Sequence, residues 1–326
     1  MIVPDHWAEA RKQHRQGKKQ ITVRRFGWSI LSEADALAMA ESRVDEALAR
    51  ILAGEKLNRR ERKTAYNGAF GVPIREEVLA RHGEEVITRN SYGAHCLNSP
   101  RALFADVDFN SPLNGRWTFT VLAFLWVASV MAGAYFQRWS VALSALVLSF
   151  LFSVPIATLL RKGHMGIQGG PERVARKQLQ QFLAQHPAWN LRVYKTPNGL
   201  RLLATHQVFD ATSKEVQEFF EAVGTDPIYQ RMCVNQRCFR ARLTAKPWRI
   251  GIPSHMRPRP GLWPVHPDRL LLRTQWVAEY ERLASGFAAC RFVESLGSGE
   301  VHDELRGVVE LHDRESRAEL STLVVA

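Results

Sequence analysis

Two aspartates separated by a single residue are the clearest candidates for chemistry in this sequence. Asp106 and Asp108 belong to the pentapeptide FADVD (residues 104–108), in which apolar and acidic residues alternate. The alternation predicts a β-strand over residues 101–109 that carries both carboxylates on one face. Carboxylates placed in this way suit a hard divalent cation that also holds phosphate oxygens. We therefore expect Asp106 and Asp108 to be catalytic residues that bind Mg²⁺ or Mn²⁺.

Arginines on the neighbouring predicted strands extend this hypothesis to a phosphate site. The strand at 200–205 carries Arg201, and the strand at 238–243 carries Arg240 and Arg242. Guanidinium groups bind phosphate oxygens through paired, planar hydrogen bonds. We expect these three arginines to bind the phosphates of a nucleoside triphosphate beside the metal ion. The alternative is a solvated face on which acids and arginines simply form ion pairs.

The elements that must position these residues follow a βαββαβ order, which is the ferredoxin-like plan. In that plan the first strand is central, between the third and the fourth. The aspartates would then lie between Arg201 and the Arg240/Arg242 pair. The predicted elements are a strand at 101–109, a helix at 171–186, strands at 190–195 and 200–205, a helix from the capping-box pattern at 212–215 to Gly224, and a strand at 238–243.

Two apolar segments interrupt this order between the first strand and the first helix. Residues 117–136 and 139–160 contain no charged residue, and only Gln137 and Arg138 separate them. Each has about the 20 residues that a helix needs to cross a hydrocarbon core, so we predict a transmembrane hairpin. The alternative is a buried hairpin in a large soluble protein. Close helix packing and a kink are expected from Ser129, Gly133, Ser144, Ser149 and Pro155.

The predicted fold class is an α+β membrane protein, with a two-helix transmembrane hairpin inserted in a ferredoxin-like (βαββαβ) cytoplasmic domain. The insertion is topologically harmless because a two-helix hairpin returns the chain to the side where it began. The expected domains are an N-terminal cytoplasmic α/β segment (1–100), a discontinuous palm (101–116 and 163–245), the hairpin (117–160) and a C-terminal cytoplasmic extension (246–326).

Basic residues mark the flanks of the hairpin and the chain as a whole. The 326-residue chain has a net charge of +12. Arg116 precedes the first apolar segment and Arg161 and Lys162 follow the second, whereas only Arg138 lies between them. The positive-inside rule therefore predicts a multi-pass protein of the bacterial inner membrane with both termini cytoplasmic. The charge also favours either anionic lipid headgroups of the bilayer, or nucleic acid and nucleotides, as partners.

Local patterns outside the palm predict further elements. We expect residues 1–20 to be loosely ordered, then a strand at 20–28, a helix at 32–53, a turn-rich segment at 58–71, a helix at 73–82, a strand at 85–89 and a loop at 90–100. After the palm we expect a proline-rich run at 253–267, a helix at 270–283 and a strand at 290–294, and no element is assigned beyond residue 306.

Four cysteines fit a reducing compartment and define no disulfide framework. Cys233 and Cys238 are five residues apart, and His95 adjoins Cys96, so a zinc site is conceivable. Buried free thiols are the other interpretation. The sequence lacks the GxSxG, P-loop, HExxH and GxGxxG patterns of other catalytic families.

Two of these segments resemble motifs of the archaeo-eukaryotic primases and related primase-polymerases. FADVD at 104–108 resembles their hydrophobic DxD motif, and TPNGLR at 196–201 resembles their turn leading into a Gly-Leu-His strand. The resemblance covers residues 101–243 without the hairpin. It implies a palm whose carboxylates bind catalytic metal, and metal-dependent nucleotidyltransferase-like activity. Nucleotidyl cyclases share this palm plan and a first-strand aspartate, and are a second enzymatic option.

The sequence also departs from the primase pattern. Arg201 stands where the family has a histidine that contacts nucleotide phosphates, and His206 lies five residues further on. Asp210 and Asp226 occupy helix-cap and turn positions rather than that of the family's third acidic residue. A hairpin within the palm is foreign to replicative primases. These departures keep a second hypothesis open, a non-enzymatic membrane-bound interaction or scaffold protein.

Overall fold

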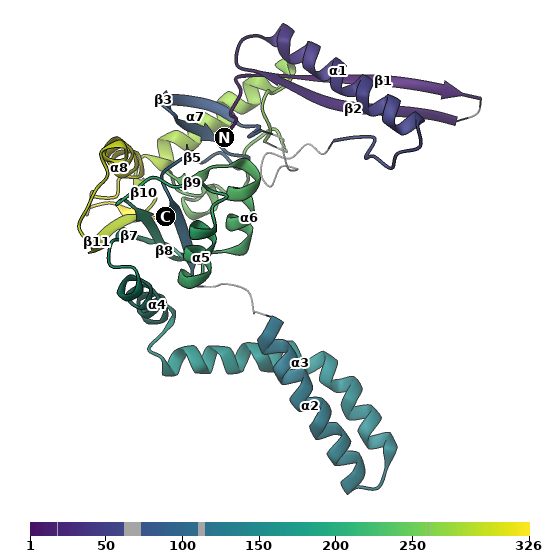
Figure 1. Cartoon of the computed structure of the whole chain (residues 1–326), viewed down its shortest axis with the longest axis vertical. Helices are drawn as coiled ribbons and strands as arrows, with labels where there is room; N and C mark the ends of the chain where they lie inside the picture. Colours follow the sequence, from purple (N-terminus) through teal and green to yellow (C-terminus); the bar gives the residue numbers. More distant parts are fainter. Residues whose placement is uncertain (18, 62–72, 110–114, 260) are drawn as a thin grey trace.

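The computed structural model describes residues 1–17, 19–61, 73–109, 115–259 and 261–326. A mixed α+β body carries two projections, an N-terminal arm and a long helical hairpin, which leave it in different directions (Figure 1). Most of the predicted turn-rich segment 58–71, and residues 110–114 of the predicted palm segment 101–116, lie outside the described residues.

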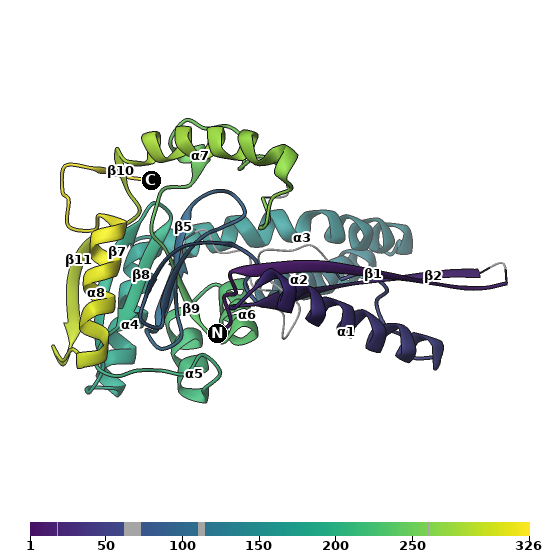
Figure 2. The ribbon, with the colours of Figure 1, turned by 90° about the horizontal axis from the view of Figure 1, so that it is seen from above.

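The N-terminal arm is an antiparallel ribbon of β1 (His6–Gln16) and β2 (Lys19–Ser29) with α1 (Glu33–Leu52) along one face. Figure 2 shows the ribbon and α1 extending together from the body. The predicted strand and helix are confirmed, and the Ser32 hydroxyl caps α1 by accepting from the Asp35 amide at 3.1 Å. The prediction of a loosely ordered start is wrong. β1 packs small side chains such as Ala8 and Ala10 against α1 and buries Trp7 near its start, an apolar pattern too weak to predict a strand.

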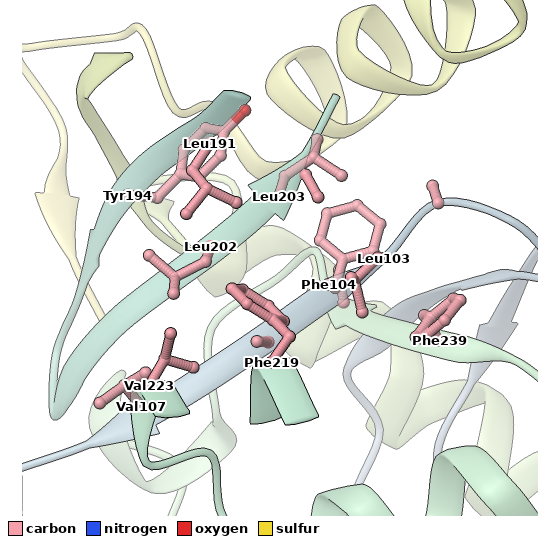
Figure 3. Packing of buried hydrophobic residues seen from close by; sticks show 14 of the residues in the cluster. Leu103, Phe104, Val107, Leu191, Tyr194, Leu202, Leu203, Phe219, Val223 and Phe239 are labelled. Atoms are coloured by element: carbon pink, nitrogen blue, oxygen red, sulfur yellow. The ribbon is translucent and has the colours of Figure 1, made fainter. Parts of the chain in front are cut away.

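The first sheet of the body has the strand order β11-β7-β8-β6, and all its pairings are antiparallel. Helices α4 and α5 pack beside one another, and Figure 3 shows Phe219 and Val223 of α5 against β6 and β8. On the other face, His312 of α8 packs against Phe104 and Tyr194. The elements are β6 (Phe104–Asp108), α4 (Pro171–Gln185), β7 (Asn190–Thr196), β8 (Gly199–Ala204), α5 (Lys214–Val223), β11 (Arg291–Gly297) and α8 (Asp303–Ser316).

A second antiparallel sheet has the order β3-β4-β5-β9. Its strands are β3 (Glu77–His82), β4 (Glu85–Arg89), β5 (His95–Ser99) and β9 (Phe239–Arg242). The helix predicted at 73–82 is wrong, because Gly83 adopts a positive φ of 62° in a tight β3–β4 turn rather than ending a helix. The loop predicted at 90–100 is also wrong in part, because β5 pairs on both sides.

The order of the palm strands differs from the prediction at one pairing. β6 pairs with β8 and β8 with β7, as the ferredoxin-like plan requires. β9 pairs with β5 instead of β6, so β6 is an edge strand and not the central one. β6 and β9 still lie beside each other, and they meet across a seam between the two sheets.

The remaining elements of the body follow β8 in the chain. The predicted helix at 270–283 is confirmed as α7, and β11 begins one residue after the start of the predicted strand. The C-terminal segment left unassigned by the sequence contains α8 and β12, and β12 pairs in parallel with β10. The further elements are α6 (Pro227–Gln236), η1 (Pro247–Arg249), η2 (Pro267–Arg269), α7 (Leu270–Ala284), β10 (Phe287–Ala288) and β12 (Val324–Val325).

The hairpin consists of α2 (Gly115–Tyr135) and α3 (Trp139–Ile167). Among the described residues these two helices are long and apolar enough to cross a membrane. α3 runs further than predicted and includes most of the glycine-rich stretch after residue 162. Figure 1 shows α3 changing direction along its length, and Pro155 lies inside it.

Small residues let the two hairpin helices approach closely. A Cβ at Gly133 would lie 2.5 Å from the Cβ of Ala142, so only glycine fits this contact. Ser129 and Ser149 are buried, as their predicted role requires, whereas Ser144 is exposed and takes no part in the contact.

Candidate functional site

A pocket of about 420 Å³ lies at the seam between the two sheets. All five residues predicted to form a site line it, together with side chains from the loops on either side of β5 and β9. The lining residues are Asn90, Ser91, Tyr92, Cys96, Asp106, Asp108, Thr196, Asn198, Arg201, Asp226, Tyr229, Met232, Arg240, Arg242, Lys246 and Arg249. The predicted acids and arginines therefore converge, although β9 does not pair with β6.

Side chains rather than a backbone ladder join the sheets at this seam. The hydroxyl of Tyr229 accepts from the Arg240 amide at 3.2 Å and lies 3.0 Å from the carbonyl oxygens of Phe104 and Arg240. Arg201 reaches from β8 across β6 and donates to the Arg242 carbonyl at 2.7 Å. The pocket therefore lies where β6 and β9 are not hydrogen-bonded to each other as neighbouring strands of one sheet.

Asp106 and Arg201 face each other across the β6–β8 pairing and form a two-point ion pair. Nε and Nη2 of Arg201 donate to the two carboxylate oxygens of Asp106 at 2.9 and 3.3 Å. Arg201 is only 2% exposed. Burial alone would lower the pKa of Arg201, but the Asp106 carboxylate outweighs burial and raises it. Arg201 therefore stays charged, and it holds Asp106 at the pocket wall.

Asp108 lies at the exposed end of β6 and shares the pocket with two other carboxylates. Burial on the pocket side raises its pKa, and repulsion from Asp106 and Asp226 raises it further. Asp226 caps α6 by accepting from the Ile228 amide at 3.1 Å, and its own amide donates to the Asp106 carbonyl at 3.3 Å. Three mutually repelling carboxylates make this end of the pocket favourable for a cation.

Close approach of β8 to β6 depends on one glycine. A Cβ on Gly199 would lie 1.9 Å from the Val107 carbonyl oxygen, which no other residue could accommodate. The Phe109 amide donates to the Asn198 carbonyl at 2.9 Å and extends this contact past Asp108. The TPNGLR turn thus lies directly beside the DxD end of β6.

Arg240, which the sequence predicts to bind phosphate, pairs with a buried carboxylate in the structure. Its Nη2 donates to Glu76 at 2.7 Å, and the two side chains are 5% and 0% exposed. The Glu76 carboxylate raises the pKa of Arg240 despite the opposing effect of burial. Glu76 falls in the segment for which the sequence predicted a helix, so its partnership with β9 was not foreseen.

Three further cations, Arg242, Lys246 and Arg249, line the pocket. Among the described residues, no Asp or Glu side chain lies within ion-pair distance of Arg242, Lys246 or Arg249. Arg242 donates to backbone oxygens, at 2.6 Å to Thr244 and 3.4 Å to Ala326. Burial lowers the pKa of Lys246 and of Arg249, and repulsion from Arg242 lowers both further. Attraction to the Asp108 carboxylate opposes this fall in both pKa values. A cluster of like charges of this kind is relieved by a bound anion.

The carboxylates fit a divalent cation only in combination with a ligand. Among the described residues no group of three or more His, Cys, Asp or Glu side chains is arranged to hold a metal ion. Mg²⁺ is, however, commonly bound by one or two carboxylates together with substrate phosphates and water. Asp106 and Asp108 could supply that share, with the phosphates on Arg242, Lys246 and Arg249.

Sequence reasoning missed Lys246, Arg249 and Tyr92, and gave Asp226 only a structural position. Lys246 and Arg249 flank a proline and a tryptophan at the start of a proline-rich run, and no periodicity there indicates which way they point. His206 lies away from the pocket, against Trp189 and Phe209. The four cysteines are buried and unbridged.

Comparison with protein-family models, with curated proteins and with solved structures gave no match to this chain.

Proposed function

We propose that this chain is a two-pass inner-membrane protein whose cytoplasmic domain binds a nucleotide or related phosphate compound with a divalent cation. The observation that carries the proposal is the pocket at the seam, where Asp106 and Asp108 share the lining with three cations that pair with no Asp or Glu side chain among the described residues. The carboxylates would hold Mg²⁺ or Mn²⁺, and the cations would hold phosphate. A nucleotidyltransferase-like reaction is the enzymatic form of this proposal.

The membrane assignment is supported by the surface of the hairpin. Only 17% of the apolar window in each helix is buried, whereas a core helix of a soluble protein would be mostly buried. Large side chains such as Phe119, Phe124, Leu143 and Leu151 are exposed along it. A 21-residue helix such as α2 is about 31 Å long, which matches a hydrocarbon core.

The positive-inside rule supports a cytoplasmic body. Arg161 and Lys162 lie at the body end of α3, and the described elements before α2 and after α3 lie at that same end of the hairpin (Figure 1). A hairpin that enters and returns would leave both ends of this chain on the cytoplasmic side.

A ferredoxin-like palm remains part of the proposal. The order β9, β6, β8, β7 is that of a ferredoxin-like sheet if the seam is counted as a neighbour contact. Tyr229 and Arg201 would replace the missing β6–β9 ladder and leave room for ligand.

Nucleotide binding by the full chain in detergent, with and without Mn²⁺, tests the proposal. A labelled nucleoside triphosphate should bind in a Mn²⁺-dependent manner, and Asp106→Asn combined with Asp108→Asn should abolish that dependence. Asp108→Asn alone leaves the Asp106–Arg201 pair intact, so it probes the site without disturbing the seam. Asp303→Asn, at an exposed helix start, is the matched control. Unchanged Mn²⁺-dependent binding in the double variant would show that the metal site is wrong.

The second candidate is a non-enzymatic membrane-bound interaction protein. The N-terminal arm favours it, because the β1–β2 ribbon and α1 project from the body and expose apolar side chains such as Leu37 and Met39 (Figure 2). A chain that binds neither nucleotide nor inorganic polyphosphate, with or without Mn²⁺, would support this candidate instead.

A further inference from the structure

Three aromatic rings gather beside the cationic wall of the pocket. Tyr92 lines the pocket, and Trp248 packs against it nearly edge-on, with ring centroids 5.4 Å apart and planes at 60°. His255 contacts both rings, at 5.1 Å from Trp248 and 6.5 Å from Tyr92. The proposed phosphate site is therefore flanked by a compact aromatic cluster.

Trp248 is the exposed member of this cluster. It lies between Lys246 and Arg249 in the chain, and it is 47% exposed. The Nζ atom of Lys246 lies 5.5 Å from the centre of its ring. Tyr92 and His255 pack against Trp248, and Tyr92 connects it to the lining of the pocket. Nearly half of the surface of Trp248 stays exposed beside Lys246. An open aromatic ring beside cations suits a planar group attached to a phosphate chain.

The loop that presents Tyr92 is fixed by its own hydrogen bonds. The side-chain oxygen of Asn90 accepts from the amides of Tyr92 and Ala94 at 3.2 and 3.0 Å. Gly93 adopts a φ of 106°, and a Cβ there would lie 2.3 Å from the ring of Trp276. Tyr92 is thus held in place before any ligand binds, which lowers the entropy cost of stacking on this cluster.

We infer that Trp248, supported by Tyr92, is a nucleobase-binding element, so that the ligand of the pocket is a nucleotide rather than an inorganic polyphosphate or a lipid phosphate. This inference rests on the proposed phosphate site and adds the recognition of the base. Stacking on an open tryptophan is tolerant of base identity because every base has a π-face.

Binding of three probes to the full chain in detergent with Mn²⁺ tests this inference. The probes are adenosine triphosphate, ribose 5-triphosphate and inorganic tripolyphosphate. Trp248→Leu keeps apolar volume against Tyr92 but removes the aromatic ring, and Trp248→Phe retains a ring. We expect Trp248→Leu to weaken adenosine triphosphate binding on the order of 10-fold. Trp248→Phe should lose much less, and tripolyphosphate should bind equally well to all three proteins.

The remaining outcomes separate this inference from the proposed function. Equal binding of adenosine triphosphate by wild type and Trp248→Leu would overturn the base assignment and leave the phosphate site standing. An equal loss for adenosine triphosphate and tripolyphosphate would give Trp248 a structural role only. A further outcome is that ribose 5-triphosphate binds as tightly as adenosine triphosphate and loses affinity in Trp248→Leu. That result would show that Trp248 recognises the sugar, and it would overturn the inference. Wild-type protein that binds none of the probes would refute both proposals.

Discussion

The two walls of the pocket carry the same kinds of charge in opposite arrangements. On the inner wall, Arg201 and Arg240 are buried, and each is held by a carboxylate, Asp106 and Glu76 respectively. The outer wall consists of Arg242, Lys246 and Arg249, which are half-buried and form no ion pair with an Asp or Glu side chain among the described residues.

The difference separates structural charges from charges available to a ligand. A buried arginine without a counter-ion is strongly destabilising, so both inner pairs must persist in the folded body. Half-buried cations that retain some water can stay unpaired at moderate cost, and their mutual repulsion favours a bound anion. The two walls should therefore respond in opposite ways to loss of a charge.

The largest effect is expected on the inner wall, from Glu76→Gln. Glu76 accepts from Arg240 at 2.7 Å and from the Thr88 hydroxyl at 2.6 Å, and the substitution removes the carboxylate that pairs with the buried Arg240 charge. We expect the free energy of unfolding, measured by urea titration in detergent, to fall by about 3–5 kcal/mol. Glu304→Gln, which removes an exposed partner of Arg101, is the control and should cost less than about 1 kcal/mol. Similar losses in the two variants would contradict the special status of the inner wall.

A buried carboxylate that lacks an arginine provides the next test. Glu85, the first residue of β4, accepts a hydrogen bond from the Ser99 hydroxyl at 3.1 Å. Burial raises the pKa of Glu85 to about 7. Glu84 raises that pKa further, and Arg101 opposes the rise. Because the folded protein binds this proton more tightly than the unfolded chain, Glu85 favours folding at low pH. Its contribution is lost as the pH rises from about 4.5 to 7, and it amounts to about 3 kcal/mol.

Glu85→Gln should remove that pH dependence. The comparison is the change in the free energy of unfolding between pH 5 and pH 8, in wild type and in the variant. We expect the wild type to lose more stability than the variant over this range, by up to about 3 kcal/mol. Parallel pH profiles for the two proteins would show that Glu85 is already ionised in the folded state.

The smallest effect on stability is expected on the outer wall. Lys246→Gln combined with Arg249→Gln removes two charges that repel each other, so the free energy of unfolding should change by less than about 0.5 kcal/mol. Binding of tripolyphosphate with Mn²⁺ should weaken about 10-fold or more, because two charge-assisted hydrogen bonds are lost. Lys177→Gln, an exposed lysine on α4, is the matched control. A large loss of stability with unchanged binding would place these cations with the structural charges.

Local sequence patterns were sufficient for most elements that lie around the site. Capping by Ser32 and Ser213, proline at the start of α4 and the alternation at 104–108 all act within a few residues, so they are visible in the chain itself. The apolar hairpin is determined in the same way, because length and lack of charge are local properties. The shared face of Asp106 and Asp108 follows from the two-residue period of a strand.

The pairings that complete the site are not local. Glu76 and Arg240 are 164 positions apart in the chain, and Asp106 and Arg201 are 95 positions apart, with the hairpin between them. The hydrophobic periodicity of the sequence does not show that β9 pairs with β5 rather than with β6. An edge of β5 and an edge of β6 each present backbone N–H and C=O groups with which β9 could pair.

The sequence by itself determined that two acids and three arginines would occupy strands of one α+β domain beside an apolar hairpin. Only the tertiary structure decided which of those charged side chains form ion pairs with each other and which could bind a ligand. The physical reason is that ion pairing depends on contacts between strands distant in the chain, and those contacts exist only once both sheets have formed. The positions of Lys246 and Arg249 in the pocket, and of Trp248 beside it, were decided in the same way, because nothing in their own segment indicates what they face.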